Sequence, residues 1–137
     1  MHMACHHIGI FTRNPKRLIP FYTQGLGFSE GEMRVLPPDL MGKIFGLASE
    51  CQLTKLSQDG AVIEVFSPVE YEVDDCSPRT SGYNHWGLEV EDKEAYVRIL
   101  EERGVPVLKV DNRGRTIFFV KDPEGNLIEI YERKINL

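Results

Sequence analysis

The chain has 137 residues, of which 42% are hydrophobic and 27% charged, a composition typical of a compact globular domain and not of a disordered chain. Its 16 Lys and Arg against 21 Asp and Glu give a net charge of −5, which disfavours binding to nucleic acid or to an anionic membrane. No apolar run approaches the roughly 20 residues of a membrane span, and three cysteines without a CxxC motif (Cys5, Cys51 and Cys76) indicate reduced thiols, so we expect a cytoplasmic protein.

The first half of the chain predicts a strand, a helix and three further strands. An Asn-Pro step at 14–15 starts the helix, and we expect Pro20 to bend it, because proline removes one backbone hydrogen bond. Glycine in the 25–27 segment ends this helix, and the Asp-Gly step at 59–60 predicts a hairpin. The predicted elements are a strand over 4–12, a helix over 14–27, a weak strand over 28–35, helical turns over 40–47, and strands over 51–56 and 61–66.

A polar stretch then leads into a second half with the same order of elements. Pro68 to Ser81 combines prolines with acidic residues and is typical of a linker or a mobile loop. Asp92 caps the next helix and Gly104 ends it. The predicted elements are a strand over 85–90, a helix over 92–103, and strands over 105–110, 115–121 and 127–132. We therefore expect a single domain over 1–137 made of two modules, about 4–67 and 84–133, joined by a polar linker over 68–83.

The two halves also share sequence. His7–Ile10 matches His85–Leu88, and Val62–Phe66 matches Leu127–Tyr131. Each half therefore opens with a His-x-Gly strand and closes with an apolar strand that carries one central glutamate. This pattern indicates an old duplication, in which two modules too small to bury separate cores share one.

Two histidines and two glutamates, His7, Glu64, His85 and Glu129, occupy matched places in this repeat. Bulky apolar residues alternate with them, so we expect all four to point away from the face that the helices cover. On a concave and partly dry surface their carboxylates require compensation, which a divalent cation provides. Two imidazoles and two carboxylates are compatible with Ni, Zn, Co, Mn or Fe. For each residue taken alone, an ordinary exposed or hydrogen-bonded side chain is the more common role, and that interpretation stays open.

Five stretches carry a family resemblance that covers nearly the whole chain: His7–Ile10, Phe21–Tyr22 with Leu26–Phe28, Val62–Val65, Asn84–Val90 and Asp122–Glu129. Together they resemble the vicinal-oxygen-chelate superfamily, the group of glyoxalases, bleomycin resistance proteins and extradiol dioxygenases. The resemblance implies an α+β fold of paired βαβββ modules that form a curved, cup-like mixed sheet with helices on the outside. It also implies one divalent metal ion held by the four matched residues, the ligand pattern of bacterial glyoxalase I.

The resemblance further implies a lyase or isomerase that chelates vicinal oxygens of a small substrate and moves a proton through an enediolate, with Glu129 or Glu64 as the base. Four ligands on an octahedral ion leave two positions for substrate oxygens, whereas a dioxygenase needs three. Two alternatives stay open: an Fe(II) extradiol dioxygenase with His7, His85 and Glu129 as ligands, and a non-catalytic, drug-sequestering protein. Phe11 stands where glyoxalase I has an arginine that contacts glutathione, so we expect a more apolar or differently charged substrate.

The expected partners are a small-molecule substrate and a second copy of the chain, with no nucleic acid and no membrane. Exposed strand edges in each half favour a homodimer, because an open edge otherwise invites aggregation. Whether each metal site lies within one chain or across the dimer stays open. The segments 37–47 and 68–81 are candidate substrate-covering loops.

Overall fold

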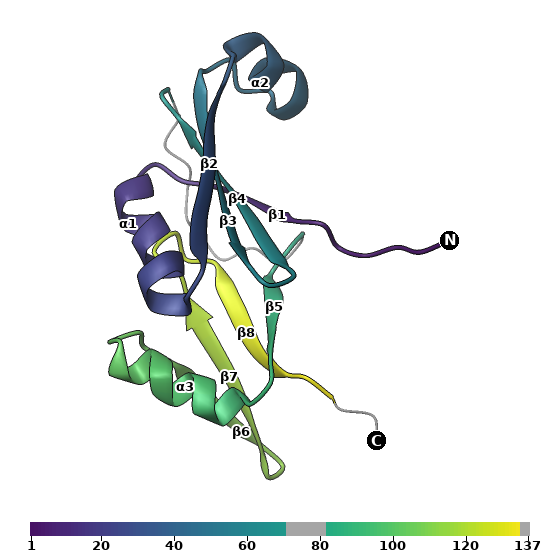
Figure 1. Ribbon diagram of the computed structural model, residues 1–137, viewed down its shortest axis with the longest axis vertical. Coiled ribbons are helices and arrows are strands. Elements are labelled where there is room, and N and C mark those ends of the chain that lie inside the picture. The colour runs from purple at the N-terminus through teal and green to yellow at the C-terminus, as the bar shows by residue number, and fades with distance from the viewer. Residues whose placement is uncertain (71–81, 135–137) are drawn as a thin grey trace. The chain divides into compact units, whose positions relative to one another are not determined.

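The computed structural model describes residues 1–70 and 82–134, and the chain divides into two compact units, Met1–Cys76 and Ser77–Leu137. Each unit contains one four-stranded sheet, with strand order β1-β4-β3-β2 in the first and β5-β8-β7-β6 in the second (Figure 1). In both sheets the first and last strands of the unit are parallel neighbours, and the other pairs are antiparallel. The predicted α+β class with paired βαβββ modules is therefore confirmed.

The helix of the first unit changes its winding at Pro20, the residue at which the sequence predicts a bend. The chain is α-helical up to Pro20 and π-helical from Phe21, and Gly27 then takes a left-handed φ of 97° that ends the helix. The missing N–H of Pro20 removes one α-helical hydrogen bond at that point. The elements of this unit are β1 (Ile8–Phe11), α1 (Pro15–Pro20), η1 (Phe21–Leu26), β2 (Ser29–Leu36), α2 (Pro38–Phe45), β3 (Cys51–Gln58) and β4 (Ala61–Pro68).

The core of the first unit lies on the face of the sheet that α1 covers. Helix α1 contacts β4, and Leu18 and Tyr22 are fully buried on the helical side. By alternation along the strands, the buried Ile10, Ile63 and Val65 share one face of the sheet. Strand β1 begins at Ile8 and is shorter than the predicted 4–12, because its ladder to β4 begins only at that residue.

The second unit follows the predicted order of elements closely. The carboxylate of Asp92 accepts a hydrogen bond from the backbone N–H of Ala95 at 2.9 Å, which caps α3 as expected. The predicted strand over 105–110 is displaced to Leu108–Asn112, because Pro106 has no N–H to donate and the ladder to β7 starts at Leu108. The elements are β5 (His85–Val90), α3 (Lys93–Glu102), β6 (Leu108–Asn112), β7 (Arg115–Lys121) and β8 (Leu127–Glu132).

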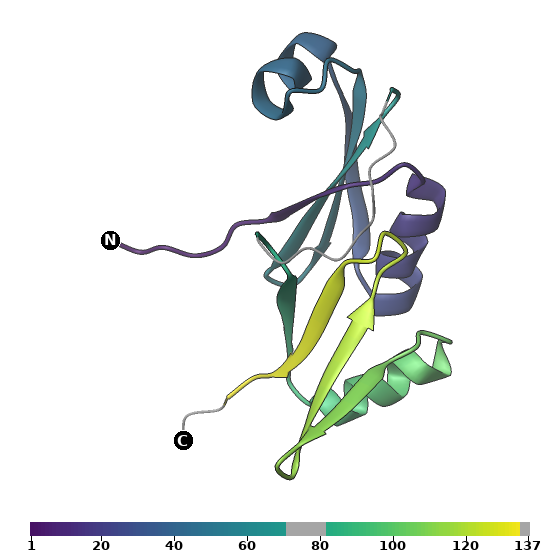
Figure 2. The ribbon, with the colours of Figure 1, turned by 180° about the vertical axis from the view of Figure 1, so that it is seen from behind.

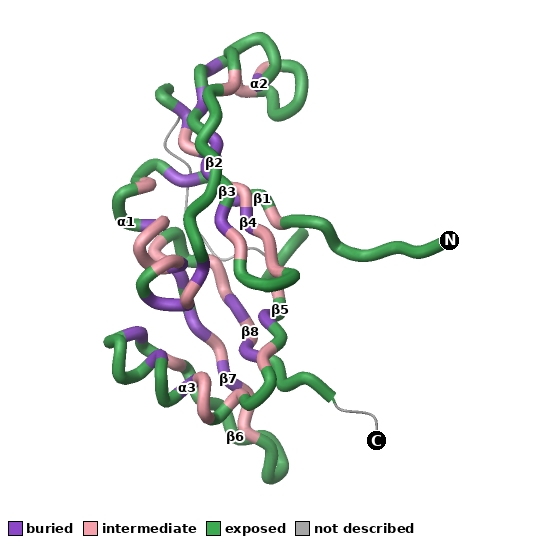
Figure 3. The backbone as a smooth tube through the Cα atoms, viewed as in Figure 1, coloured by how far each residue is buried: buried purple, intermediate pink, exposed green. Residues whose placement is uncertain are grey.

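Helix α3 covers one face of the second sheet, as views from opposite sides show (Figures 1 and 2). Val97 and Leu100 are the buried residues of this helix, and buried residues alternate with intermediate ones along the middle of β7 and β8 (Figure 3). Among the described residues, no helix combines the length and the apolar character that crossing a membrane requires.

Candidate metal centre

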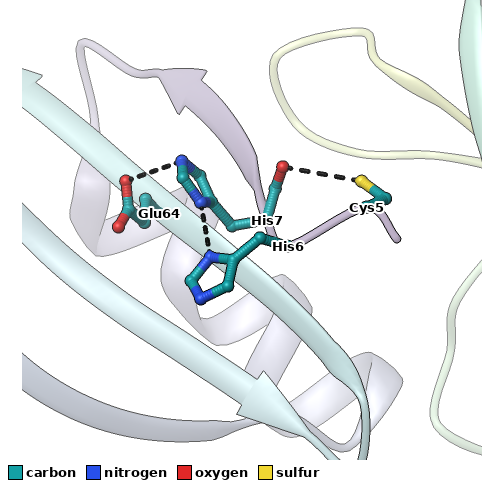
Figure 4. Close-up of polar contacts among 4 residues, drawn as sticks. All are labelled: Cys5, His6, His7 and Glu64. Atoms are coloured by element: carbon teal, nitrogen blue, oxygen red, sulfur yellow. Dashed lines mark hydrogen bonds and ion pairs between the residues drawn. The ribbon is translucent and has the colours of Figure 1, made fainter. Parts of the chain in front are cut away.

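In the first unit, His7 and Glu64 form a close pair. Nε2 of His7 lies 3.3 Å from Oε2 of Glu64, and the two side chains are 42% and 22% exposed (Figure 4). His7 directly precedes β1, and Glu64 lies in the middle of β4, opposite Gly9 in the parallel register. The pair therefore lies on the face of the first sheet that bears Gly9 and Glu64, opposite the core; we call this the site face.

The second unit repeats this arrangement. Nε2 of His85 lies 3.4 Å from Oε2 of Glu129, with side chains 38% and 28% exposed. Glu129 is opposite Gly87 in the parallel register of β5 and β8, and the face of this sheet that bears both residues is the site face of the second unit. The duplication predicted from sequence thus places one imidazole and one carboxylate together in each unit.

The environment of His85 bears on whether its pair suits a cation. Nδ1 of His85 contacts Oδ1 of Asn84, which is an acceptor, so Nδ1 carries the hydrogen and donates it. In the neutral ring the lone pair of Nε2 then faces the carboxylate of Glu129. Either a proton on Nε2 or a divalent cation satisfies both atoms. Phe119 supports the ring from the side, with a centroid distance of 5.4 Å.

The environment of His7 is different, because its neighbour in the chain is another histidine. Nδ1 of His7 lies 2.9 Å from Nδ1 of His6, and the carbonyl oxygen of His7 accepts a weak hydrogen bond of 3.7 Å from the thiol of Cys5 (Figure 4). One of the two imidazoles must donate to the other, which leaves Nε2 of His7 directed at Glu64.

The spacing of the donor atoms fits a metal ion. Two ligands held about 2.0–2.2 Å from one ion lie about 2.8–3.1 Å apart at a right angle and about 3.3–3.6 Å apart at the tetrahedral angle. The separations of 3.3 Å and 3.4 Å agree with the tetrahedral spacing in both units. Within either unit, the described residues contain no group of three His, Cys, Asp or Glu side chains arranged for a metal ion. Each unit therefore brings together two donor atoms, one imidazole nitrogen and one carboxylate oxygen.

A tight turn sets the start of β8, the strand that carries Glu129. The buried carboxylate of Asp122 accepts hydrogen bonds of 2.9 Å from the backbone N–H groups of Glu124 and Asn126, and one of 2.8 Å from the side-chain amide of Asn126. Gly125, with φ of 86°, completes the turn. The Asp-Pro-x-Gly-Asn motif thus has a structural role, since it sets the point at which β8 begins.

The site face of the first unit also carries an aromatic cluster that sequence reasoning missed in part. Phe11 follows Gly9 by two residues and Phe66 follows Glu64 by two, so both share the site face. The ring of Phe45, from α2, contacts both of them. The spacing of Glu64 and Phe66 along β4 was the available signal for Phe66, whereas Phe45 is brought in by tertiary packing alone.

Of the two segments expected to cover a substrate, the structure describes the first in full and the second only in small part. The segment 37–47 contains α2, which packs on the site face through the buried Met41. Most of the segment 68–81, including Cys76, lies outside the described residues. Of the other two cysteines, Cys5 is exposed, Cys51 is buried, and both are free thiols.

Comparison with protein families finds a match over nearly the whole chain. A family model described as the Glyoxalase/Bleomycin resistance protein/Dioxygenase superfamily matches residues 4–130. A comparison with curated proteins finds no match.

Solved structures share the fold. A glyoxalase family protein from Enterococcus faecalis is 23% identical with a TM-score of 0.70, and covers 94% of this chain and 97% of its own. A glyoxylase/bleomycin resistance protein/dioxygenase domain from Frankia sp. EAN1pec is 15% identical with a TM-score of 0.76, and the match covers 100% of this chain and 96% of that domain. The trypanothione-dependent glyoxalase I of Leishmania major is 24% identical with a TM-score of 0.65, at 96% and 87% coverage.

Proposed function

The chain belongs to the glyoxalase/bleomycin resistance protein/dioxygenase superfamily, and on this premise we propose that it is a divalent-metal-dependent lyase or isomerase of the glyoxalase I type. The metal ligands in this proposal are His7, Glu64, His85 and Glu129. The observation that carries it is the repeated pair, because an imidazole nitrogen and a carboxylate oxygen face each other at ligand spacing in both units. Polar side chains distributed at random over the surface would not form the same pair in both units.

The divalent ion would supply Lewis acidity toward two neighbouring oxygens of the substrate. The contribution of the chain is the proton transfer. The carboxylate of Glu64 or Glu129 takes a proton from the carbon next to the substrate carbonyl and returns it to the adjacent carbon. Both side chains are suited to this role, because they are 22% and 28% exposed and so remain accessible to a ligand on the site face.

The equivalence of the two pairs bears on the alternatives. An Fe(II) extradiol dioxygenase would use His7, His85 and Glu129 and leave Glu64 without a role at the metal. Glu64 contacts His7 as closely as Glu129 contacts His85, which favours a four-ligand set. A drug-sequestering protein has no need of either pair.

We further propose that both units belong to one domain, that the protein is a homodimer, and that the two pairs meet on one ion within a chain or across the dimer. Families of this kind bind small molecules, and the exposed edge strands β2 and β6 are suited to pairing with a second copy.

Calorimetric titration of metal-free protein with Zn²⁺ or Ni²⁺ tests the shared site. We expect one ion per chain, and an affinity at least about tenfold weaker in both His7→Ala and His85→Ala. His2→Ala is the matched control, because His2 is an exposed histidine near the N-terminus. Two weak ions per chain, each lost in only one variant, would contradict a shared site.

A protein that binds no metal would support the sequestering alternative. Oxygen uptake by anaerobically iron-loaded protein with a panel of catechols would support the dioxygenase alternative, and absence of uptake removes it.

A further inference from the structure

Three phenylalanine rings form a cluster on the site face of the first unit. The centroids of Phe11 and Phe45 are 5.2 Å apart, those of Phe45 and Phe66 are 5.3 Å apart, and those of Phe11 and Phe66 are 5.8 Å apart. The rings come from β1, α2 and β4, so three separate elements are needed to assemble the cluster. Rings at these separations stabilise one another beyond the area they bury.

The cluster adjoins the His7–Glu64 pair. Phe66 follows Glu64 by two residues on β4, which places the two backbone positions about 7 Å apart on the same face. Gly9 allows the ring of Phe66 to lie close to the backbone of β1, because a Cβ at this position would lie only 3.3 Å from Cε2 of Phe66. The aromatic surface therefore begins directly beside the proposed metal ligands of this unit.

The cluster has a fixed base and an open surface. Phe66 is only 8% exposed and packs in a buried group with Met41, Cys51 and Leu53. Phe11 and Phe45 contact it, yet they are 47% and 43% exposed. Two large rings thus present nearly half of their surface on the face where the substrate of the proposed reaction would lie.

We infer that Phe11, Phe45 and Phe66 form a subsite for an aryl group of the substrate, so that the substrate class is a 2-oxo compound whose ring lies one or two bonds from the carbon that bears the nearer chelating oxygen. This inference rests on the proposed function, because the metal half-site defines where the oxygens lie. A ring that packs against Phe11 and Phe45 removes apolar surface of both partners from water. The three side chains carry no charge, so the subsite gives no preference to a charged group.

The test compares phenylpyruvate with pyruvate, which share the vicinal oxygens and differ by the ring. Both are titrated calorimetrically into zinc-loaded protein. We expect phenylpyruvate to bind about tenfold more tightly, the effect of burying part of one ring. In Phe11→Ala and in Phe45→Ala this ratio falls to about twofold or less, while the Kd of pyruvate and of zinc stays unchanged. Phe11→Leu, which keeps apolar volume without the ring, gives an intermediate ratio.

Met33→Ala is the matched control, because Met33 is 55% exposed on the opposite face of the same sheet and should leave the ratio unchanged. Equal binding of the two acids to zinc-loaded protein, or binding of neither, overturns the aryl subsite alone. A change of oligomeric state in Phe11→Ala or Phe45→Ala, with an unchanged ratio, overturns it in favour of a contact between copies of the chain. Absence of zinc binding by the unmodified protein instead contradicts the proposed function.

Discussion

Glu64 and Glu129 occupy the same position in their two sheets, since each is the parallel register partner of the glycine that follows its histidine by two residues. This shared register accounts for the nearly equal His–Glu separations of 3.3 Å and 3.4 Å. The two halves differ in length, so the number of residues between histidine and glutamate does not determine the His–Glu contact. The register of the parallel strands determines it, and this register brings the same two donor atoms together in each unit.

If Glu129 is the base, Glu129→Gln should reduce turnover at least about 100-fold, because an amide cannot act as a general base. The amide oxygen can still act as a ligand, so metal content should fall less than in His7→Ala. The measurement is turnover of those 2-oxo compounds, hemithioacetals and thioesters that the unmodified protein converts, with metal content determined by elemental analysis.

Glu64→Gln, assayed in parallel, identifies which carboxylate is the base. Glu102→Gln is the control, because Glu102 is an exposed carboxylate on α3 and not on a strand of either sheet. Unchanged turnover in both Glu64→Gln and Glu129→Gln would refute a glutamate base.

The two strand glycines should respond differently to an added methyl group. In Gly9→Ala the new Cβ meets the ring of Phe66 at 3.3 Å, and the buried ring has little room to move. We expect the free energy of unfolding to fall by about 1 kcal/mol. Gly87→Ala is the matched variant, because nothing lies within 4 Å of its Cβ, and it should be neutral or slightly stabilising. Urea denaturation checks both, and equal effects would contradict the close approach at Gly9.

Asp122→Ala should destabilise the protein by about 2 kcal/mol. Its carboxylate accepts three hydrogen bonds in the turn before β8, and their loss leaves three partly buried donors without this acceptor. Glu124→Ala is the control, since it keeps the backbone N–H of Glu124 that donates to Asp122. Thermal unfolding measures both variants. A change in Asp122→Ala no larger than that of the control would rule out a structural role for the turn.

Because Tyr96 is partly buried, we expect the free energy of unfolding to fall in alkali. Burial raises the pKa of Tyr96 to about 12 from 10.0, and the nearby charge of Arg103 opposes this only in part. Between these values the unfolded chain loses the phenolic proton while the folded chain keeps it, so unfolding becomes easier as pH rises. By pH 12 the loss approaches about 2–3 kcal/mol.

Urea denaturation at pH 9 and pH 11.5 measures this slope, and Tyr96→Phe should remove the contribution of Tyr96. Tyr83→Phe, at a fully exposed position, should leave the slope as it is. An identical slope in Tyr96→Phe would show that other groups control the alkaline transition.

Much of the fold was predictable because local signals agree with tertiary structure. Strand β5 follows from alternation and is confirmed. Proline chemistry predicts a disturbance of the helix at Pro20, and the α-helical winding ends at that residue. The predicted start of β6 was wrong by three residues, because hydrogen bonding to the neighbouring strand, and not apolar content, decides where the strand begins. Within each unit, the register of parallel strands brought the matched histidine and glutamate together, which sequence identity of the halves already suggested.

The aromatic cluster was less accessible to sequence reasoning. Phe11 was recognised through a resemblance, and Phe66 shares the alternation of Glu64. Phe45 lies in a helix that the sequence indicated only as one or two turns, and its contact with β1 depends on how Met41 anchors α2. Such contacts depend on packing between elements, which no local pattern encodes.

Helix α2 stands where the second unit has only a tight turn at Arg113 and Gly114 between β6 and β7. The two units are therefore alike at their His–Glu pairs and different at the phenylalanine cluster. An insertion in one copy of an ancient repeat can alter which molecules are accepted without disturbing the donors inherited by both copies. Selectivity and chemistry can in this way evolve on separate parts of the same small chain.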